Sequence, residues 1–252
     1  VVELNCEPTG RFAHNPEPIP ENLIQISEKI KECGADLGIV VDPDVDRLAL
    51  VCENGEMFVE EYTLVAVADY VLKHTPGNTV SNLSSSRALR DVTLAHGQQY
   101  NAAAVGEVNV VTKMKETNTV IGGEGNGGVI YPESHYGRDA LVGVGLFLSH
   151  FVAEGKSMTV LKATYPQYFI SKNKLTLSPD MDVDKILEGL KKKYASEEIT
   201  DIDGVKIDFK DGWVHLRKSN TEPIIRIYSE SKDEAAANQL AEEVIKVAQS
   251  LY

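Results

Sequence analysis

The sequence has few cysteines, few basic residues and no long apolar run, and each shortage argues against a class of protein. Its three cysteines, Cys6, Cys33 and Cys52, are odd in number, which is typical of free thiols in a reducing cytoplasm rather than of a disulfide framework. Lysine and arginine total 25 against 38 aspartates and glutamates, so the net charge of −13 argues against general nucleic-acid binding. No stretch approaches the roughly 20 apolar residues of a membrane span. We therefore expect a cytoplasmic protein with no nucleic-acid or membrane partner.

Apart from these shortages, the amino-acid composition is that of an ordinary globular protein. Hydrophobic residues make up 42% and charged residues 25% of the 252 residues. At roughly 100–150 residues per domain, this length suits about two domains. The chain opens at Val1 with no initiator methionine, and from this we expect a piece of a longer protein.

Apolar spacing predicts an α/β chain followed by a small α+β domain. A helix around residues 23–33 precedes two buried-type strands at 37–41 and 48–52. From residue 62 onward the expected helices and strands alternate, which favours a mainly parallel or mixed sheet: helices at 64–72, 86–96, 105–115 and after Asp139, and strands at 79–83 and 119–123. A linker is expected around residues 165–167. After it we expect helices at 183–194 and near the C-terminus, with strands at 205–209, 213–217 and 224–228.

The first loop that carries chemistry lies between the two early strands and reads Asp42-Pro43-Asp44-Val45-Asp46-Arg47. Three carboxylates at alternate positions repel one another when a loop brings them together, and a divalent cation compensates for that repulsion. A Mg²⁺ ion held in this way keeps coordination positions for water or a phosphate oxygen. Arg47 suits the phosphate that such an ion would bind.

Three other interpretations of this loop stay open. In an EF-hand, Asp42, Asp44 and Asp46 would take positions 1, 3 and 5 with Glu53 at position 12, although Arg47 stands where that loop needs glycine. A strand followed by Asp42-x-Asp44 also suggests an aspartate-nucleophile phosphatase, although Asp46 departs from that pattern. The third interpretation is an acidic surface turn.

The second loop, residues 122–128, holds five glycines around Glu124 and Asn126. Glycines allow close backbone approach to a ligand, while Glu124 and Asn126 offer an acceptor and an amide for hydroxyl groups. A tight structural turn would explain the glycines without those two side chains. Further along, we expect Asp139 to cap a helix and His135 to be a surface histidine.

The third loop, residues 217–223, concentrates polar and cationic groups in an acidic chain. Such side chains, together with backbone amides, suit a phosphate ester. The groups concerned are Arg217, Ser219, Asn220 and Thr221, with Arg226 on the outgoing strand. A solvated turn ending in Pro223 is the alternative when this loop is considered alone.

Together and in this order, the three loops closely resemble those of the α-D-phosphohexomutase superfamily. Residues 42–47 look like its DGDGDR-type metal loop, residues 123–128 like its GEMSGH-type sugar loop, and residues 217–223 like its RxSNTEP-type phosphate loop. The resemblance implies the C-terminal part of the second family domain at 1–56. It implies the third domain at 57–165 and the fourth at 166–252.

The resemblance also implies a reaction and a role for each loop. Asp42, Asp44 and Asp46 would ligate Mg²⁺ together with a phosphoserine oxygen, and Arg47 would steady the transferring phosphoryl group. Glu124 and Asn126 would hold sugar hydroxyls. A phosphorylated hexose or hexosamine would pass through a 1,6-bisphosphate, interconverting the 1-phosphate and the 6-phosphate, and its non-reacting phosphate would be held by Arg217, Ser219, Asn220, Thr221 and Arg226.

This sequence departs from the family pattern at three places. Ala13 precedes His14-Asn15-Pro16 where the family's nucleophile segment reads Ser-His-Asn-Pro, so we expect the serine to belong to missing N-terminal domains and this chain to be inactive alone. Gly128 stands where many members carry histidine, and a serine run at 84–86 leaves no general base identified. The loop from Gly125 to Gly128 resembles phosphoglucosamine-type members. A non-catalytic phosphosugar-binding module is the alternative function.

Overall fold

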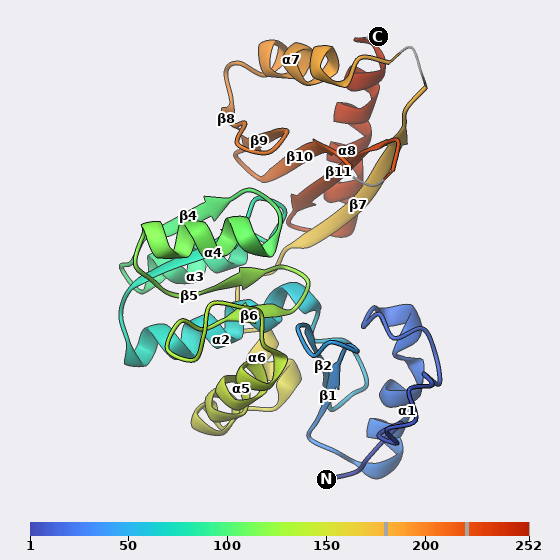
Figure 1. The fold of residues 1–252 in the computed structure, drawn as a ribbon, viewed down its shortest axis with the longest axis vertical. Coiled ribbons are helices and arrows are strands. Elements are labelled where there is room, and N and C mark those ends of the chain that lie inside the picture. The colour runs from blue at the N-terminus through green and yellow to red at the C-terminus, as the bar shows by residue number, and fades with distance from the viewer. Residues whose placement is uncertain (179–180, 220–221, 252) are drawn as a thin grey trace. The chain divides into compact units, whose positions relative to one another are not determined.

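The computed structural model describes residues 1–178, 181–219 and 222–251. It divides into two compact units (Figure 1). The first comprises Val1–Ala102 with Gly106–Pro166, and the second comprises Ala103–Val105 with Gln167–Tyr252.

The first unit opens with a helix and a hairpin that carries the metal loop. A single 3-10 turn, η1 (Pro20–Asn22), precedes α1 (Ile24–Cys33), which ends as expected at Gly34 in the left-handed conformation (φ 65°). Strands β1 (Leu37–Val41) and β2 (Leu48–Cys52) then pair antiparallel, with Val41 opposite Leu48. This register makes residues 42–47 the hairpin loop.

The two strands differ in burial, which corrects part of the sequence interpretation. Strand β2 is buried along its whole length, whereas Ile39 and Val41 of β1 are exposed. Within the described residues, β1 pairs with β2 alone in a two-stranded sheet. An apolar run therefore predicted both strands correctly, but it predicted the burial of β1 wrongly.

The rest of the first unit is a four-stranded sheet with helices packed on it. The sheet order is β4-β3-β5-β6, with β3 and β5 parallel and β5 and β6 antiparallel, so the expected mixed sheet is confirmed. The strands are β3 (Asn78–Asn82), β4 (Tyr100–Ala103), β5 (Thr119–Glu124) and β6 (Gly128–Ile130). The helices are α2 (Glu60–His74), α3 (Ala88–Ala95), α4 (Glu107–Glu116), α5 (Ala140–Glu154) and α6 (Met158–Lys162).

Helix α2 forms the centre of this unit. It packs against α3, α5 and β5, and most of its length is buried, including Leu64, Val65 and Val67. The apolar residues contributed by the sheet and α5 complete this core: Val80, Ile121, Val129 and Phe147. This packing fixes the position of β5, which pairs with β3 and ends where the candidate sugar loop begins.

The second unit is the expected small α+β domain. Its antiparallel sheet has the order β7-β11-β10-β9-β8, formed by β7 (Phe169–Thr176), β8 (Glu198–Thr200), β9 (Val205–Phe209), β10 (Gly212–Lys218) and β11 (Ile224–Ser231). The core between the sheet and helices α7 (Val183–Lys193) and α8 (Glu234–Gln249) contains Ile186, Leu190, Val214, Ile227 and Val244. Across the described ranges, no helix combines the length and apolar character needed to cross a membrane.

Candidate functional site

The metal loop is folded around the carboxylate of Asp42. Its Oδ1 accepts hydrogen bonds from the backbone N–H groups of Asp46 and Arg47, each at 3.0 Å. Val45 takes a left-handed backbone conformation (φ 58°), which turns the chain back over Asp42. As a result, Asp42, Asp44 and Asp46 each offer one oxygen, and these atoms all lie within 4.8 Å of one another.

The charges in this loop fit a divalent cation. Burial, and then the hydrogen bond with Asp42, raise the pKa of Asp46 to about 6. Burial opposes the charge on Asp42 as well, but the backbone N–H of Arg47, the side-chain hydrogen bond with Asp46 and the backbone N–H of Asp46 together outweigh it and lower the pKa of Asp42. Within the described part of the chain, Asp46 Oδ1 is buried without a hydrogen-bond partner. A hard cation such as Mg²⁺ prefers oxygen ligands of this kind and would relieve the repulsion among them.

The surroundings of the loop bear on its alternative interpretations. Glu53, which an EF-hand would use as its last ligand, accepts hydrogen bonds from Thr159 N at 3.1 Å and Thr159 Oγ1 at 2.5 Å instead. Its carboxylate thus caps α6, and the loop is flanked by strands rather than helices. A surface turn explains the amide bonds to Asp42 but not the convergence of three carboxylates.

The sugar loop begins at the end of β5 with a buried carboxylate. Glu124 Oε1 accepts hydrogen bonds from Asn82 Nδ2 at 2.7 Å and Gly106 N at 3.2 Å. Ser85 Oγ accepts a hydrogen bond from Gly125 N at 2.9 Å. The serine run after β3 therefore supports the loop. Asn126 Oδ1 accepts a hydrogen bond from Gly128 N at 3.1 Å and closes the turn.

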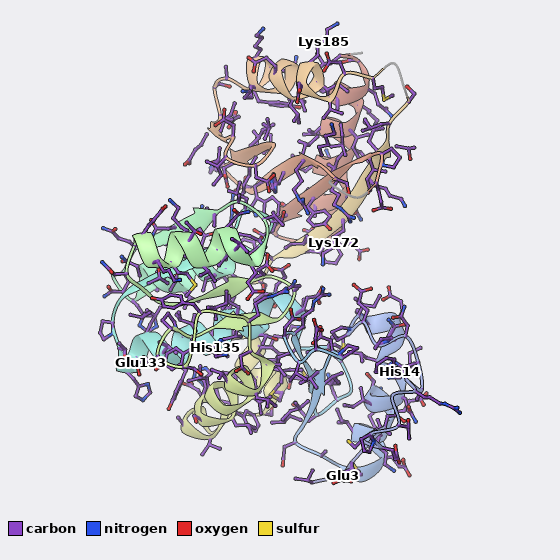
Figure 2. All side chains as sticks on the ribbon, viewed as in Figure 1. Glu3, His14, Glu133, His135, Lys172 and Lys185 are labelled. Carbon is purple, nitrogen blue, oxygen red and sulfur yellow. The ribbon has the colours of Figure 1, made fainter. Side chains whose placement is uncertain are left out.

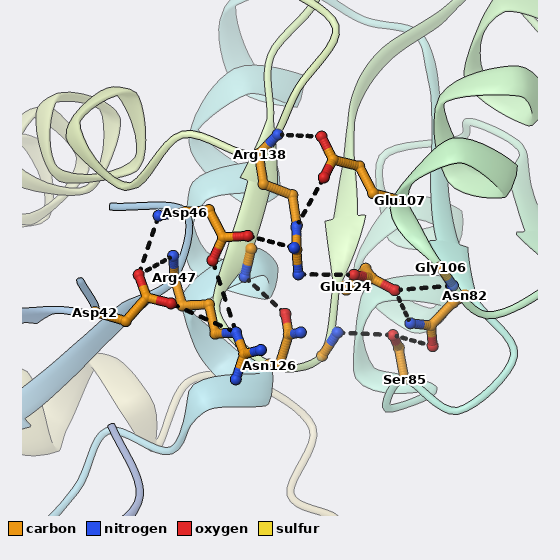
Figure 3. A network of polar contacts seen from close by, with 12 residues as sticks. Asp42, Asp46, Arg47, Asn82, Ser85, Gly106, Glu107, Glu124, Asn126 and Arg138 are labelled. Carbon is orange, nitrogen blue, oxygen red and sulfur yellow. Dashed lines mark hydrogen bonds and ion pairs between the residues drawn. The ribbon is translucent and has the colours of Figure 1, made fainter. Parts of the chain in front are cut away.

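The metal loop and the sugar loop are in contact within the first unit. Leu48 N, at the start of β2, donates a hydrogen bond to Gly127 O at 3.0 Å, and Ala140 N donates to Val45 O at 3.0 Å. Gly127 has a φ of +87°, and a Cβ there would clash with the Leu48 carbonyl oxygen, so this position needs glycine. Arg138 contacts carboxylates of both loops (Figure 3).

The segment before α5 holds one residue that sequence reasoning missed. Asp139 caps α5 by accepting a hydrogen bond from Val142 N at 2.9 Å, as expected. His135, labelled in Figure 2, has a half-exposed side chain as expected, with Nε2 2.9 Å from Asp139 Oδ2. Residues 131–139 are rich in ligand-type groups, but the sequence assigns no role to Arg138 among them. An isolated arginine in an acidic chain, directly before a helix cap, was the available signal.

The phosphate loop lies in the second unit, between β10 and β11. Asn220 and Thr221 lie outside the described residues. Ser219 is buried, and its Oγ accepts a hydrogen bond from Glu222 N at 3.3 Å. Arg226 Nη2 is 2.8 Å from Glu222 Oε2, so the Arg226 guanidinium already has one anionic partner in this structure.

Basic residues form a row across three strands at this loop. Arg217 of β10 is directly opposite Arg226 of β11, which is opposite Lys174 of β7. Like charges directly opposite one another on neighbouring strands destabilise a sheet unless an anion compensates for them. Arg217 Nε is buried and finds no hydrogen-bond partner among the residues that the structure describes. These features fit the anion site that the sequence indicates.

Three family models match successive parts of the chain. They describe phosphoglucomutase/phosphomannomutase alpha/beta/alpha domain II at residues 1–55, alpha/beta/alpha domain III at 60–168 and the C-terminal domain at 175–247. The chain belongs to the phosphoglucomutase/phosphomannomutase family. This confirms the superfamily resemblance and the fold expected from it.

Individual relatives agree with this membership. The phosphoglucomutase/phosphomannomutase of Thermococcus kodakarensis is 39% identical over 98% of this chain, which covers 55% of that protein. A probable phosphoglucosamine mutase of Methanopyrus kandleri is 32% identical, with the same shares covered. The crystal structure of a family protein from Burkholderia thailandensis has a TM-score of 0.80 and 27% identity, and the match covers 94% of this chain and 52% of that one. The chain thus spans about half the length of these relatives.

Within this family framework, the structure groups the expected site residues in two places. The first unit brings together the metal loop, with its Arg47, and the sugar loop, with Glu124 and Asn126. The second unit holds Arg217, Ser219 and Arg226 around the phosphate loop. The individual roles expected for these residues, and the domain boundaries at 56 and 165, stay predictions.

Proposed function

We propose that this chain is part of a Mg²⁺-dependent phosphohexomutase that interconverts a hexose 1-phosphate and a hexose 6-phosphate. The observation that carries the proposal is the convergence of Asp42, Asp44 and Asp46 in a loop that ends directly before Leu48, whose backbone N–H donates a hydrogen bond to Gly127 of the sugar loop. A phosphoserine outside this chain supplies and recovers the phosphate, through a 1,6-bisphosphate intermediate. The missing N-terminal domains of the same protein are thus its functional partner, and the protein works in the cytoplasm.

Each loop has one task in the proposed reaction. Asp42, Asp44 and Asp46 would hold Mg²⁺, which would supply charge neutralisation for the transferring phosphoryl group. Arg47, whose Nε lies 3.6 Å from Asp42 Oδ2, steadies that group from the edge of the metal loop. Glu124 and Asn126 hold sugar hydroxyls, and Arg217 and Arg226 hold the phosphate that is not reacting. Phosphoryl transfer needs this kind of positioning more than it needs covalent help.

The substrate class follows from the relatives and from the sugar loop. Relatives that carry the names phosphoglucomutase/phosphomannomutase and phosphoglucosamine mutase align with almost the whole of this chain. A solved structure with 13% identity, which shares the fold, is titled as a complex with GlcNAc-6P and magnesium. We therefore propose a phosphorylated hexose or hexosamine. The sequence from Gly125 to Gly128 favours the phosphoglucosamine type.

Metal titration tests the site that carries the proposal. Asp44→Asn removes the negative charge of one of the three converging carboxylates without touching the backbone bonds to Asp42, so Mn²⁺ or Mg²⁺ affinity is expected to fall about tenfold or more by calorimetry. Asp36→Asn, at an exposed aspartate outside the loop, is the matched control and keeps the wild-type affinity. Equal affinities for Asp44→Asn and Asp36→Asn would contradict the proposed metal site.

A coupled mutase assay tests where the nucleophile lies. The 252-residue chain is given a hexose 1-phosphate, the corresponding 1,6-bisphosphate and Mg²⁺, and no turnover is expected. Turnover that is lost on changing Ser84, Ser85 or Ser86 to alanine would show that the nucleophile is in this chain. A parent protein that binds phosphosugars without turnover would instead indicate a phosphosugar-binding module.

A further inference from the structure

Arg138 occupies a central position between the two loops of the first unit (Figure 3). Its side chain is only 15% exposed, and its guanidinium contacts three carboxylates from three separate segments. Nη2 contacts Asp46 of the metal loop, Nη1 lies 3.0 Å from Glu124 Oε2 in the sugar loop, and Nε lies 3.3 Å from Glu107 Oε2 at the start of α4. Its backbone N–H also donates to Glu107 Oε1 at 3.0 Å.

The side chain reaches this position because residue 128 has no side chain. A Cβ added to Gly128 would lie 2.5 Å from Arg138 Cδ, 3.1 Å from Arg138 Cγ and 3.1 Å from Asn126 Oδ1, so the arginine stem is the nearest obstacle. Gly128 lies in β6 and lacks the left-handed backbone that favours glycine, so space rather than backbone conformation explains the residue. The arginine stem cannot move aside without giving up ion pairs to two loops.

We propose that Arg138 is a positioning residue that couples the metal loop to the sugar loop, and that glycine at position 128 is required to admit its side chain. The planar guanidinium suits this role because its fork of donors can contact several carboxylates at once, which a lysine ammonium does not reproduce. Without it, among the described residues, Asp46 would keep only the 3.7 Å ion pair with Arg47, and Glu124 would keep only its neutral donors Asn82 and Gly106. The coupling to metal rests on the proposed function of the metal loop.

The role has a consequence that simple structural damage would not produce. The positively charged guanidinium of Arg138 lies against Asp46 and repels a second positive charge, such as a divalent cation, at the same carboxylate. Removing Arg138 is therefore expected to loosen the two loops and, at the same time, to tighten divalent-cation binding. A residue that merely supported the fold would weaken cation binding when removed.

A double-mutant cycle in EDTA-containing buffer tests the coupling without any metal. Gly128→Ala is expected to lower the thermal midpoint of the otherwise unchanged chain, and to lower it clearly less in the Arg138→Ala background, where only the 3.1 Å approach to Asn126 Oδ1 remains. The matched controls are Gly145→Ala, whose added Cβ meets nothing within 4 Å, and Arg90→Ala, a half-exposed arginine paired with Asp91. Equal destabilisation by Gly128→Ala in both backgrounds would overturn the proposal.

Mn²⁺ titration by calorimetry tests the electrostatic part. Arg138→Ala is expected to tighten Mn²⁺ binding about tenfold, while Arg138→Lys, which keeps the charge, stays near the wild-type affinity. Unchanged or weaker binding by Arg138→Ala would refute the coupling to the metal loop. If the wild-type chain binds no Mn²⁺, the proposed metal site is wrong, and the cycle above still decides whether Arg138 and Gly128 act as one unit.

Discussion

Acidification is expected to destabilise the second unit, because strand β10 buries a histidine two residues before Arg217. His215 is 1% exposed, and its Nε2 donates a hydrogen bond to the backbone oxygen of Asp203 at 2.7 Å. Burial, together with the nearby charges of Lys206 and Arg217, lowers the pKa of His215 from 6.5 to about 4, although the Asp203 contact opposes this change.

The sign and size of the effect follow from this difference in pKa. The unfolded chain binds a proton near pH 6.5, whereas the folded chain resists it until about pH 4. The contribution of neutral His215 to the free energy of unfolding is therefore fully present above pH 6.5 and is lost as the pH is lowered toward 4. At about 1.36 kcal/mol for each pH unit, the gap corresponds to a loss of roughly 3 kcal/mol in the free energy of unfolding.

The sole tryptophan provides the assay. Trp213 is buried on the same strand, so its fluorescence during urea unfolding reports on the second unit. His215→Gln preserves a donor for the Asp203 oxygen but does not titrate, so its stability is expected to fall much less between pH 7 and pH 4.5. His14→Gln, at an exposed histidine, is the control and should behave as wild type. Parallel losses in wild type and His215→Gln would refute the argument.

Three further changes test other parts of the structure. Arg217→Met should weaken binding of a hexose 1,6-bisphosphate about tenfold in calorimetry, because it removes one of two opposed arginines, and an unchanged affinity would argue against the phosphate site. Asp139→Ala should cost about 1 kcal/mol in urea unfolding through loss of the α5 cap, and Asp139→Asn should restore most of it. Gly127→Ala should cost more than Gly10→Ala by the same measurement, since both positions have positive φ but only Gly127 lies against the Leu48 backbone.

Much of the fold could be predicted from local patterns. Helix α1 ends at Gly34 and helix α5 begins after Asp139, because each capping residue acts on the turn beside it. Strands β4, β6, β7 and β8 were not predicted. In β7, Lys172 and Lys174 interrupt the apolar pattern, and only pairing with β11 makes this stretch a strand.

The candidate site divides in the same way. The sequence by itself determined the three loops, because the residues of each loop, such as Asp42, Asp44 and Asp46, are close neighbours along the chain. Only the tertiary structure decided what holds them: Asn82 and Arg138 reach Glu124 from 42 and 14 residues away. Contacts of this kind depend on sheet order and helix packing, which no local pattern specifies. Burial of β1 was decided at this level too, since an apolar strand is buried only where another element covers it.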